Sequence, residues 1–283
     1  MIFQNNIFYK KVKDYSVSQE VFELHHNPEY DLLITFPKPN LEDLPRYYES
    51  DDYISHTDGK RTLFEKVYHL VKSIALKNKV KLINAQSEKG TLLDIGAGTG
   101  EFLVVAQKDG WQTTGIEPNS KAKAIAEQKG VRFAADLASL ESHSFDVITM
   151  WHVLEHVPNL DEYLVELHRL LKPQGTILIA VPNFKSFDAL FYGKYWAAFD
   201  VPRHIWHFSK TSIEKLFARQ SMYLAAVLPM KFDSYYVSLL SEKYKTGSMK
   251  FIRAFFVGLK SNLSGRSTNE YSSHIYILKN TKN

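Results

Sequence analysis

The glycine-rich stretch LLDIGAGTG, residues 92–100, constrains the fold of this chain more than any other feature. An apolar strand runs into a turn that contains Gly96, Gly98 and Gly100, and a helix follows. Glycines in such a turn permit positive φ angles, approach of the backbone to a ligand, and close packing of strand on helix. The stretch therefore predicts a nucleotide-type cofactor site at the end of a buried strand.

The carboxylates around this turn indicate which cofactor it takes. Glu101 stands where the dinucleotide fingerprint has its third glycine, and a carboxylate there repels a pyrophosphate. Asp94 and Glu101 instead suit a ligand with a sulfonium cation and an amino-acid end. We therefore favour S-adenosylmethionine over NAD.

Two more acidic residues follow predicted strands. Glu117 comes after residues 112–116 and 23 positions after Asp94, close to the spacing at which an acid meets ribose hydroxyls. Pro118 restricts the adjoining loop, which is expected to lie under the adenine. Asp136 ends a predicted strand at 131–135 and is expected to accept the exocyclic amine of adenine. Each acid alone also suits a helix cap or a solvated loop.

With these motifs the chain resembles the class I S-adenosylmethionine-dependent methyltransferases, in particular a bacterial group with DIGAGTG, GIEP, WHVLEHV and DVPRHIWHFS segments. The resemblance implies that Asp94 and the glycine loop hold the methionine end of the cofactor, Glu117 the ribose and Asp136 the adenine. It also implies a tyrosine-rich element over the cofactor, which falls on Tyr53 and His56. Packing of these two residues on the following helix is the alternative.

The expected architecture is a Rossmann-like, seven-stranded α/β sheet with helices on both faces. Residues 1–60 form a ribbon-like extension with a tyrosine-rich arm, and residues 61–283 form the methyltransferase domain, which opens with a helix at 61–76. Long connections at 183–208 and 232–271 are expected to build a cap over the carboxyl edge of the sheet. Strands are expected at 92–95, 112–116, 131–135, 145–150, 176–181, 223–228 and 273–278, the last one antiparallel.

Composition and charge exclude several classes of protein. The chain has no cysteine, which rules out disulfides, thiolate metal sites and cysteine nucleophiles. Its amino-terminal segment is similar to the zinc ribbon of some relatives, yet with no thiolate and only His25 and His26 nearby we expect no bound metal. No segment reaches the roughly 18 apolar residues of a membrane span, and the amino terminus does not read as a leader, so a cytoplasmic location is predicted.

The ends of the chain differ in charge. Residues 1–60 hold 6 basic and 11 acidic residues, whereas residues 241–283 hold 8 basic and 2 acidic ones. The basic end is consistent with a solvated face, an anionic substrate or a membrane surface. Within it, FIRAFFVGLK at 251–260 has apolar residues at helical spacing. We expect this apolar face to bury in the cap, with a dimer interface or peripheral contact with an anionic membrane as alternatives; the oligomeric state stays open.

The segment MWHVLEHV supplies the first two candidate catalytic residues. His152 and His156 lie at i and i+4, which on a helix would share one surface with Glu155. His152 follows the fourth strand, where the methyl group should point, and a neutral imidazole there could accept a proton from a hydroxyl or amine. A divalent cation held by the trio, as in some quinone-pathway relatives, and packing of His156 beneath the site are the alternatives.

The aromatic loop YWAAFDVPRHIWHFS, residues 195–209, supplies the third, His204. Arg203 suits a clamp for a carboxylate or phosphate, and an internal ion pair with Asp200 is the alternative. The predicted function is methyl transfer to a small-molecule, glycan or lipid-linked substrate. A non-catalytic S-adenosylmethionine-binding module and an NAD-dependent oxidoreductase are the rival hypotheses. No Asn/Asp-Pro-Pro-Tyr motif follows the fourth strand, which argues against a nucleic-acid substrate.

Overall fold

The computed structural model describes residues 4–40, 42–48 and 63–281, which form two β-sheets with helices around them. The central sheet has the order β5-β4-β6-β7-β10-β9. Strands β4 to β7 are parallel to one another, and β10 is antiparallel to both β7 and β9, as the sequence predicts. The six strands are β4 (Thr91–Ile95), β5 (Gln112–Ile116), β6 (Phe145–Trp151), β7 (Leu171–Pro182), β9 (Met222–Pro229) and β10 (Ser273–Asn280).

The predicted strand at 131–135 is wrong as a full strand. Phe133 makes a single parallel bridge to Gly115 at the outer edge of β5. The chain then turns back on itself, because the Asp136 carboxylate accepts a hydrogen bond from the Ser139 backbone N–H at 2.8 Å. The seventh strand position of the sheet is therefore reduced to one bridge.

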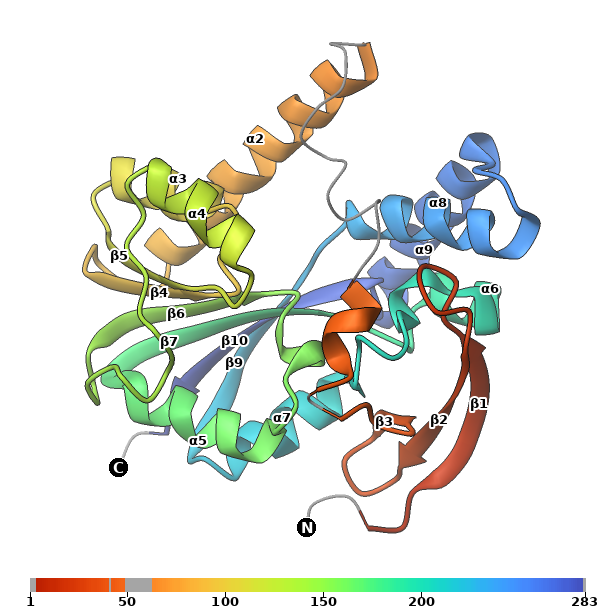
Figure 1. Cartoon of the computed structure of the whole chain (residues 1–283), viewed down its shortest axis with the longest axis horizontal. Coiled ribbons are helices and arrows are strands. Elements are labelled where there is room, and N and C mark those ends of the chain that lie inside the picture. The colour runs from red at the N-terminus through yellow and green to blue at the C-terminus, as the bar shows by residue number, and fades with distance from the viewer. Residues whose placement is uncertain (1–3, 41, 49–62, 282–283) are drawn as a thin grey trace.

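Helices cover both faces of the sheet, as predicted (Figure 1). One face carries α2 (Leu63–Asn84), α3 (Glu101–Lys108) and α4 (Ser120–Gln128), and the other α5 (Leu160–Leu170) and α7 (Lys210–Ala218). On α5 the buried residues recur every three or four positions, as an amphipathic helix requires: Leu160, Leu164, Leu167 and Leu170. Helix α2 extends past the predicted end at residue 76, because Val80 and Ile83 are buried in a cluster that the partly buried Leu76 also contacts.

The amino-terminal ribbon consists of β1 (Ile7–Lys13), β2 (Val21–Asn27) and β3 (Leu32–Phe36). It is antiparallel and gains a fourth strand, β8 (Trp206–His207), from the aromatic loop. Leu24 and Leu33 of the ribbon share a buried cluster with Phe199 of that loop. The ribbon is thus fastened to the connection that follows β7.

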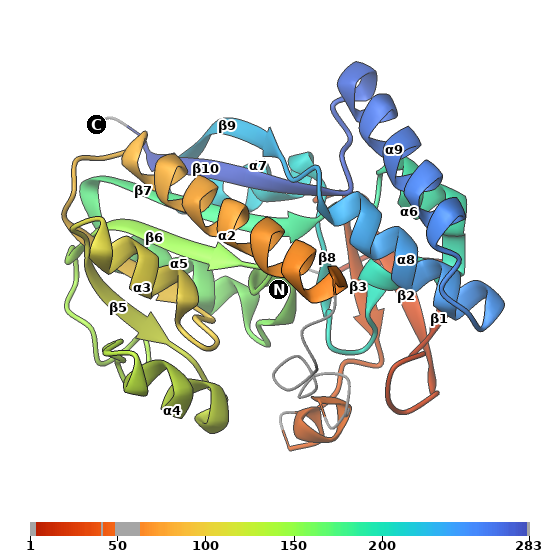
Figure 2. The same cartoon turned by 90° about the horizontal axis from the view of Figure 1, so that it is seen from above.

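The two long connections form helices that lie side by side at the end toward which the parallel strands run (Figure 2). They contain α6 (Phe187–Tyr192), α8 (Asp233–Thr246) and α9 (Phe251–Thr268). The fully buried Asp188 of α6 accepts hydrogen bonds from Trp196 Nε1 at 2.7 Å, Ser261 Oγ at 2.5 Å and Ser272 Oγ at 2.7 Å. Three donors satisfy this carboxylate and tie α6 to α9 and to the start of β10.

Within the described part of the chain, we find no helix with the length and apolar character that a membrane crossing requires.

Candidate active site

The three glycines after β4 differ in what surrounds them. All have positive φ: 72° at Gly96, 54° at Gly98 and 74° at Gly100. A Cβ on Gly96 would stand 2.4 Å from Val153 Cγ2, and one on Gly100 would stand 2.7 Å from Ala126 Cβ. A Cβ on Gly98 would meet no described atom within 4 Å. Gly96 and Gly100 therefore allow close packing, whereas the backbone at Gly98 faces space that a ligand can fill.

Glu117 stands beside that space at the end of β5. Its Oε2 accepts a hydrogen bond from Gly98 N–H and its Oε1 accepts one from Asn119 N–H, both at 2.8 Å. Asn119 in turn caps α4, since its side chain accepts from Lys121 and Ala122 N–H. Pro118 stands between Glu117 and Asn119 in the sequence. The carboxylate is thus held next to the glycine loop, where the ribose contact is predicted.

Asp94 lies in β4 just before the loop and is buried at 2% exposure. It accepts a hydrogen bond from Thr149 Oγ1 of the neighbouring β6 at 2.6 Å. Burial raises the pKa of Asp94 to about 7. An ammonium group beside it would lower that pKa again, so the position suits the amino group of a bound amino acid.

Lys79 of α2 is a site residue that the sequence analysis did not single out. Its Nζ lies 4.2 Å from the centroid of the Trp151 ring at the end of β6. Burial lowers the pKa of Lys79, and the nearby Asp94 acts in the opposite direction. Trp151 Nε1–H is buried without a hydrogen-bond acceptor among the described residues. A cation and an orphaned donor suit the carboxylate end of an amino acid, so the two ends of methionine would both find partners here.

The structure gives less direct support for the remaining predicted cofactor residues. Asp136 is exposed and closes the turn with Ser139, so its contact with adenine stays a prediction. Tyr53 and His56 lie outside the described residues. Glu101 forms ion pairs with Lys72 at 2.5 Å and Lys129 at 4.0 Å. Its charge is shared with two lysines, which weakens the expectation that it would repel a pyrophosphate.

His152 follows β6 directly and has a left-handed φ of 59°. A three-residue 3-10 helix, Leu154–His156, comes after it, so the predicted helical surface shared by His152 and His156 is wrong. His152 Nε2 lies 3.0 Å from Asp233 Oδ2, the first residue of α8, and Nδ1 lies 3.4 Å from Glu155 Oε1. Burial lowers the pKa of His152, but these two carboxylates outweigh it and raise the pKa to about 10. The two carboxylates thus favour the charged form of the imidazole, and the role of His152 as a proton acceptor stays a prediction.

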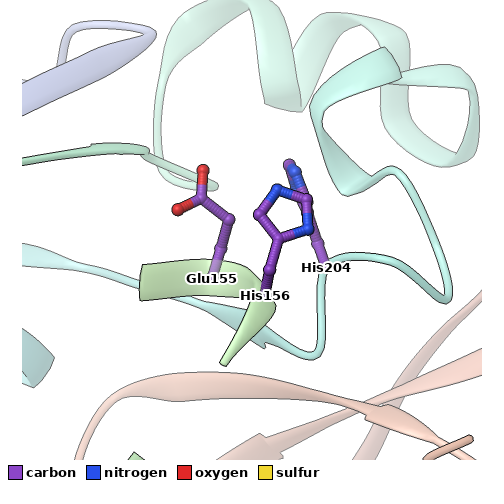
Figure 3. Close-up of side chains that lie close together, drawn as sticks. All are labelled: Glu155, His156 and His204. Carbon is purple, nitrogen blue, oxygen red and sulfur yellow. The ribbon is translucent and has the colours of Figure 1, made fainter. Parts of the chain in front are cut away.

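His156 lies beside His204, and Glu155 is close to both rings (Figure 3). The two rings lie 4.5 Å apart at their centroids in an edge-to-face arrangement. Burial, followed by the neighbouring His204, lowers the pKa of His156 to about 4. Tyr48 Oη lies 3.1 Å from His156 Nδ1, which joins this histidine to the segment after the ribbon. His156 and His204 thus pair with each other, and Glu155 lies near both this pair and His152.

Glu155, His156 and His204 form a compact group whose potential ligand atoms all lie within 4.8 Å of one another. Two imidazoles and a carboxylate form a donor set that suits a divalent cation. His204 Nδ1–H donates to the Ala198 carbonyl at 2.9 Å, which leaves its Nε2 toward the group. This trio differs from the predicted one, because His204 takes the place of His152. The expectation that the chain binds no metal stays a prediction.

The guanidinium of Arg203 makes its contacts inside the protein, so it is not a clamp for an anionic ligand. Its Nη2 lies 2.7 Å from Asp200 Oδ1 and 3.1 Å from Asp14 Oδ1, and it also contacts Ser16. Nη1–H donates to the Tyr47 carbonyl at 2.7 Å. The alternative that the sequence allowed, an internal ion pair with Asp200, is confirmed, and it extends to the ribbon.

Comparison with known proteins decides the family. A family model described as a methyltransferase domain matches residues 63–221. The chain belongs to the class I S-adenosylmethionine-dependent methyltransferases. This methyltransferase is 31% identical over 131 residues to the ubiquinone biosynthesis O-methyltransferase of Maricaulis maris, an alignment that covers 42% of this chain and 52% of that protein. A protein of the same name from Actinobacillus pleuropneumoniae is 28% identical over 160 residues, 49% of this chain and 68% of that one.

Solved structures share the fold of this methyltransferase. Geranyl diphosphate C-methyltransferase from Streptomyces coelicolor superposes with a TM-score of 0.54 at 13% identity, over 80% of this chain and 88% of that one. A methyltransferase from Thermotoga maritima gives 0.53 at 19% identity, over 77% and 95%. This chain spans about half the length of most of the curated relatives that it matches. The part that the family model matches, residues 63–221, includes the glycine loop, Glu117, Asp136 and the two histidines after β6.

Proposed function

We propose that this methyltransferase transfers a methyl group from S-adenosylmethionine to a small-molecule, glycan or lipid-linked acceptor, and that the acceptor atom is a hydroxyl oxygen. The observation that carries methyl transfer is the open glycine loop at Gly98 with Glu117 beside it, and the oxygen acceptor is proposed because the curated relatives are named O-methyltransferases. A cytoplasmic location, predicted from the sequence, is part of this proposal.

The described residues fit the proposed cofactor at both of its ends. Asp94 would face the amino group and Lys79 the carboxylate of the methionine part, while Glu117 would accept the ribose hydroxyls. The open space at Gly98 supports this assignment, because it is the one glycine of the loop whose missing side chain frees room outside the protein core. Asp136, Tyr53 and His56 are proposed to complete the adenosine side.

The role of His152 follows from its charge. S-adenosylmethionine supplies an electrophilic methyl group when it is bound, and the protein has to align the acceptor with it. An imidazolium cannot take a proton from the acceptor, so the hydroxyl proton would pass to solvent. His152 would position the acceptor oxygen by a hydrogen bond from Nδ1–H, whose contact with Glu155 is the longer of its two carboxylate contacts, at 3.4 Å. The names of the curated relatives, which are O-methyltransferases, agree with an oxygen acceptor.

An acceptor screen tests this proposal. Purified protein with S-adenosylmethionine should release S-adenosylhomocysteine in the presence of hydroxylated acceptors, and it should prefer phenols and catechols over matched aryl amines. The measurement is product formation by liquid chromatography for hydroxyl and amine members of the same ring scaffold. Turnover of the amines alone would contradict the oxygen assignment. Cofactor binding without turnover on a broad panel would favour the non-catalytic binding module.

A further inference from the structure

Helix α9 has two faces with opposite character, and the larger apolar side chains are on the outside. Its inner face, against α8 and α6, consists of small residues: Ala254, Val257, Gly258, Ser261 and Gly265. A Cβ on Gly258 would lie 3.0 Å from the Ser234 carbonyl oxygen, so the two helices touch closely. The expectation that Phe251, Ile252, Phe255 and Phe256 bury in the cap is therefore wrong.

We define the outer face of α9 as Ile252, Phe255, Phe256 and Leu263. Ile252 is 78% exposed and Phe256 is 61% exposed, and the other two are more than half exposed. Residues spaced by three, four and seven positions share one side of a helix, so these side chains form a continuous stripe opposite the small residues. A stripe of large apolar side chains in water is unfavourable unless it has a partner.

Basic side chains and further aromatics border this stripe. Arg253 Cζ lies 5.8 Å and Lys245 Nζ 5.3 Å from the centroid of the half-exposed Phe191 ring of α6. Lys260 Nζ lies 4.9 Å from the Phe187 ring. Between residues 242 and 270 the chain has six basic and two acidic residues, and one of the acidic ones, the buried Glu242, pairs with Arg253 at 3.2 Å. The surface therefore combines apolar anchors with positive charge on the same helices.

We infer that the outer face of α9, together with α6, docks on an anionic lipid bilayer. Large apolar side chains that insert among lipids, with lysine and arginine beside them, are what an interfacial helix needs. A second copy fits this surface less well, because symmetric pairing would bring two sets of positive charges together. The inference does not depend on the proposed function. It would nevertheless bring a bilayer near the site, since α8 begins at Asp233, the partner of His152.

Co-sedimentation of the full-length protein with vesicles tests the inference. At low ionic strength the wild type should sediment with vesicles of phosphatidylglycerol and phosphatidylcholine, and added salt or pure phosphatidylcholine should release it. The double variant Ile252→Ser and Phe256→Ser should lower the bound-to-free ratio by at least about tenfold, because two large apolar side chains no longer insert. The matched control is Val165→Ser on α5, where an isolated valine is 50% exposed, and it should bind like the wild type.

A second variant and two further measurements separate the outcomes. Lys250→Gln with Lys260→Gln should weaken binding to anionic vesicles while leaving the apolar stripe intact. Circular dichroism and S-adenosylmethionine affinity should match the wild type in all variants, which separates this inference from the proposed function. Failure of the wild type to sediment, or equal binding to neutral vesicles, would overturn the inference. So would a dimer in lipid-free solution, measured by analytical ultracentrifugation, that the double variant abolishes.

Discussion

Replacement of Arg203 by alanine should lower the free energy of unfolding by about 3–5 kcal/mol, because it leaves the buried Asp14 carboxylate without its countercharge. Arg203 is 7% exposed and Asp14 is 1% exposed, so water cannot readily replace the lost guanidinium at Asp14. The substitution also removes the donor to the Tyr47 carbonyl. Urea denaturation at neutral pH measures the effect.

The pH dependence gives this prediction a second readout. Burial raises the pKa of Asp14, but hydrogen bonds from the Ser18 backbone and from Arg203 outweigh it and lower the pKa to about 2. A carboxyl with a lowered pKa stabilises the fold above its unfolded value of 3.8 and loses that contribution as the pH falls toward 2. The difference between wild type and Arg203→Ala should therefore shrink between about pH 4 and pH 2.

A surface arginine supplies the control. Arg219 pairs with Asp161 at 3.0 Å, and both side chains are more than a third exposed. Arg219→Ala should cost less than about 1 kcal/mol, as exposed ion pairs do. Equal denaturation midpoints for Arg203→Ala and Arg219→Ala would contradict the interior role of Arg203.

Replacement of His152 by alanine should lower kcat by roughly 10² to 10³ while S-adenosylmethionine affinity stays nearly unchanged. The reason is its position: it follows β6 on the side of the proposed acceptor, whereas the proposed contacts with the amino group and the ribose of the cofactor lie at β4 and β5. Steady-state kinetics with the acceptor from the screen, and calorimetry with the cofactor alone, measure the two quantities.

The pH profile of activity tests which protonation state of His152 supports catalysis. Because its pKa is raised to about 10, the charged form persists through neutral pH, and the wild type should show no acid limb from this residue. Activity should fall as the pH approaches 10. Asp233→Asn should move that fall to lower pH, since it removes one of the two carboxylates. An acid limb near pH 6 to 7 that disappears in His152→Ala would instead assign a neutral base and contradict the imidazolium account.

His156→Ala is the matched variant for the neighbouring histidine. His156 packs against His204 and contacts Tyr48, so its loss should lower the melting temperature before it lowers kcat. A drop in kcat equal to that of His152→Ala, with unchanged stability, would move the acceptor site to this cluster.

Features that depend on neighbours in the sequence were predictable. The glycine loop, the strand ends that carry Asp94 and Glu117, and the antiparallel last strand all follow from short patterns. The cap helices were indicated by the length of the two connections and by helical spacing in residues 251–260.

Features that depend on distant partners were not predictable. Asp233 on α8 favours the charged form of His152, and Asp14 at the end of a ribbon strand, 189 positions from Arg203, holds that arginine in the interior. Nothing in the sequence around Lys79 marked it as a site residue; it only precedes Val80, a buried residue of α2. Residues 251–268 do form a helix, α9, but periodicity alone does not tell which face turns inward. The face with small residues turns inward, because small side chains let α8 approach closely.

The most direct test of the central claim is calorimetric titration of wild type and Glu117→Ala with S-adenosylmethionine, S-adenosylhomocysteine and NADH. We expect the wild type to bind the first two and not NADH. Glu117→Ala should lose about 1.5–3 kcal/mol of binding free energy, because the ribose hydroxyls lose a charged acceptor. Glu117→Gln, which keeps an acceptor oxygen without the charge, should fall between the two. Unchanged affinity in Glu117→Ala, or preferential binding of NADH by the wild type, would contradict the account.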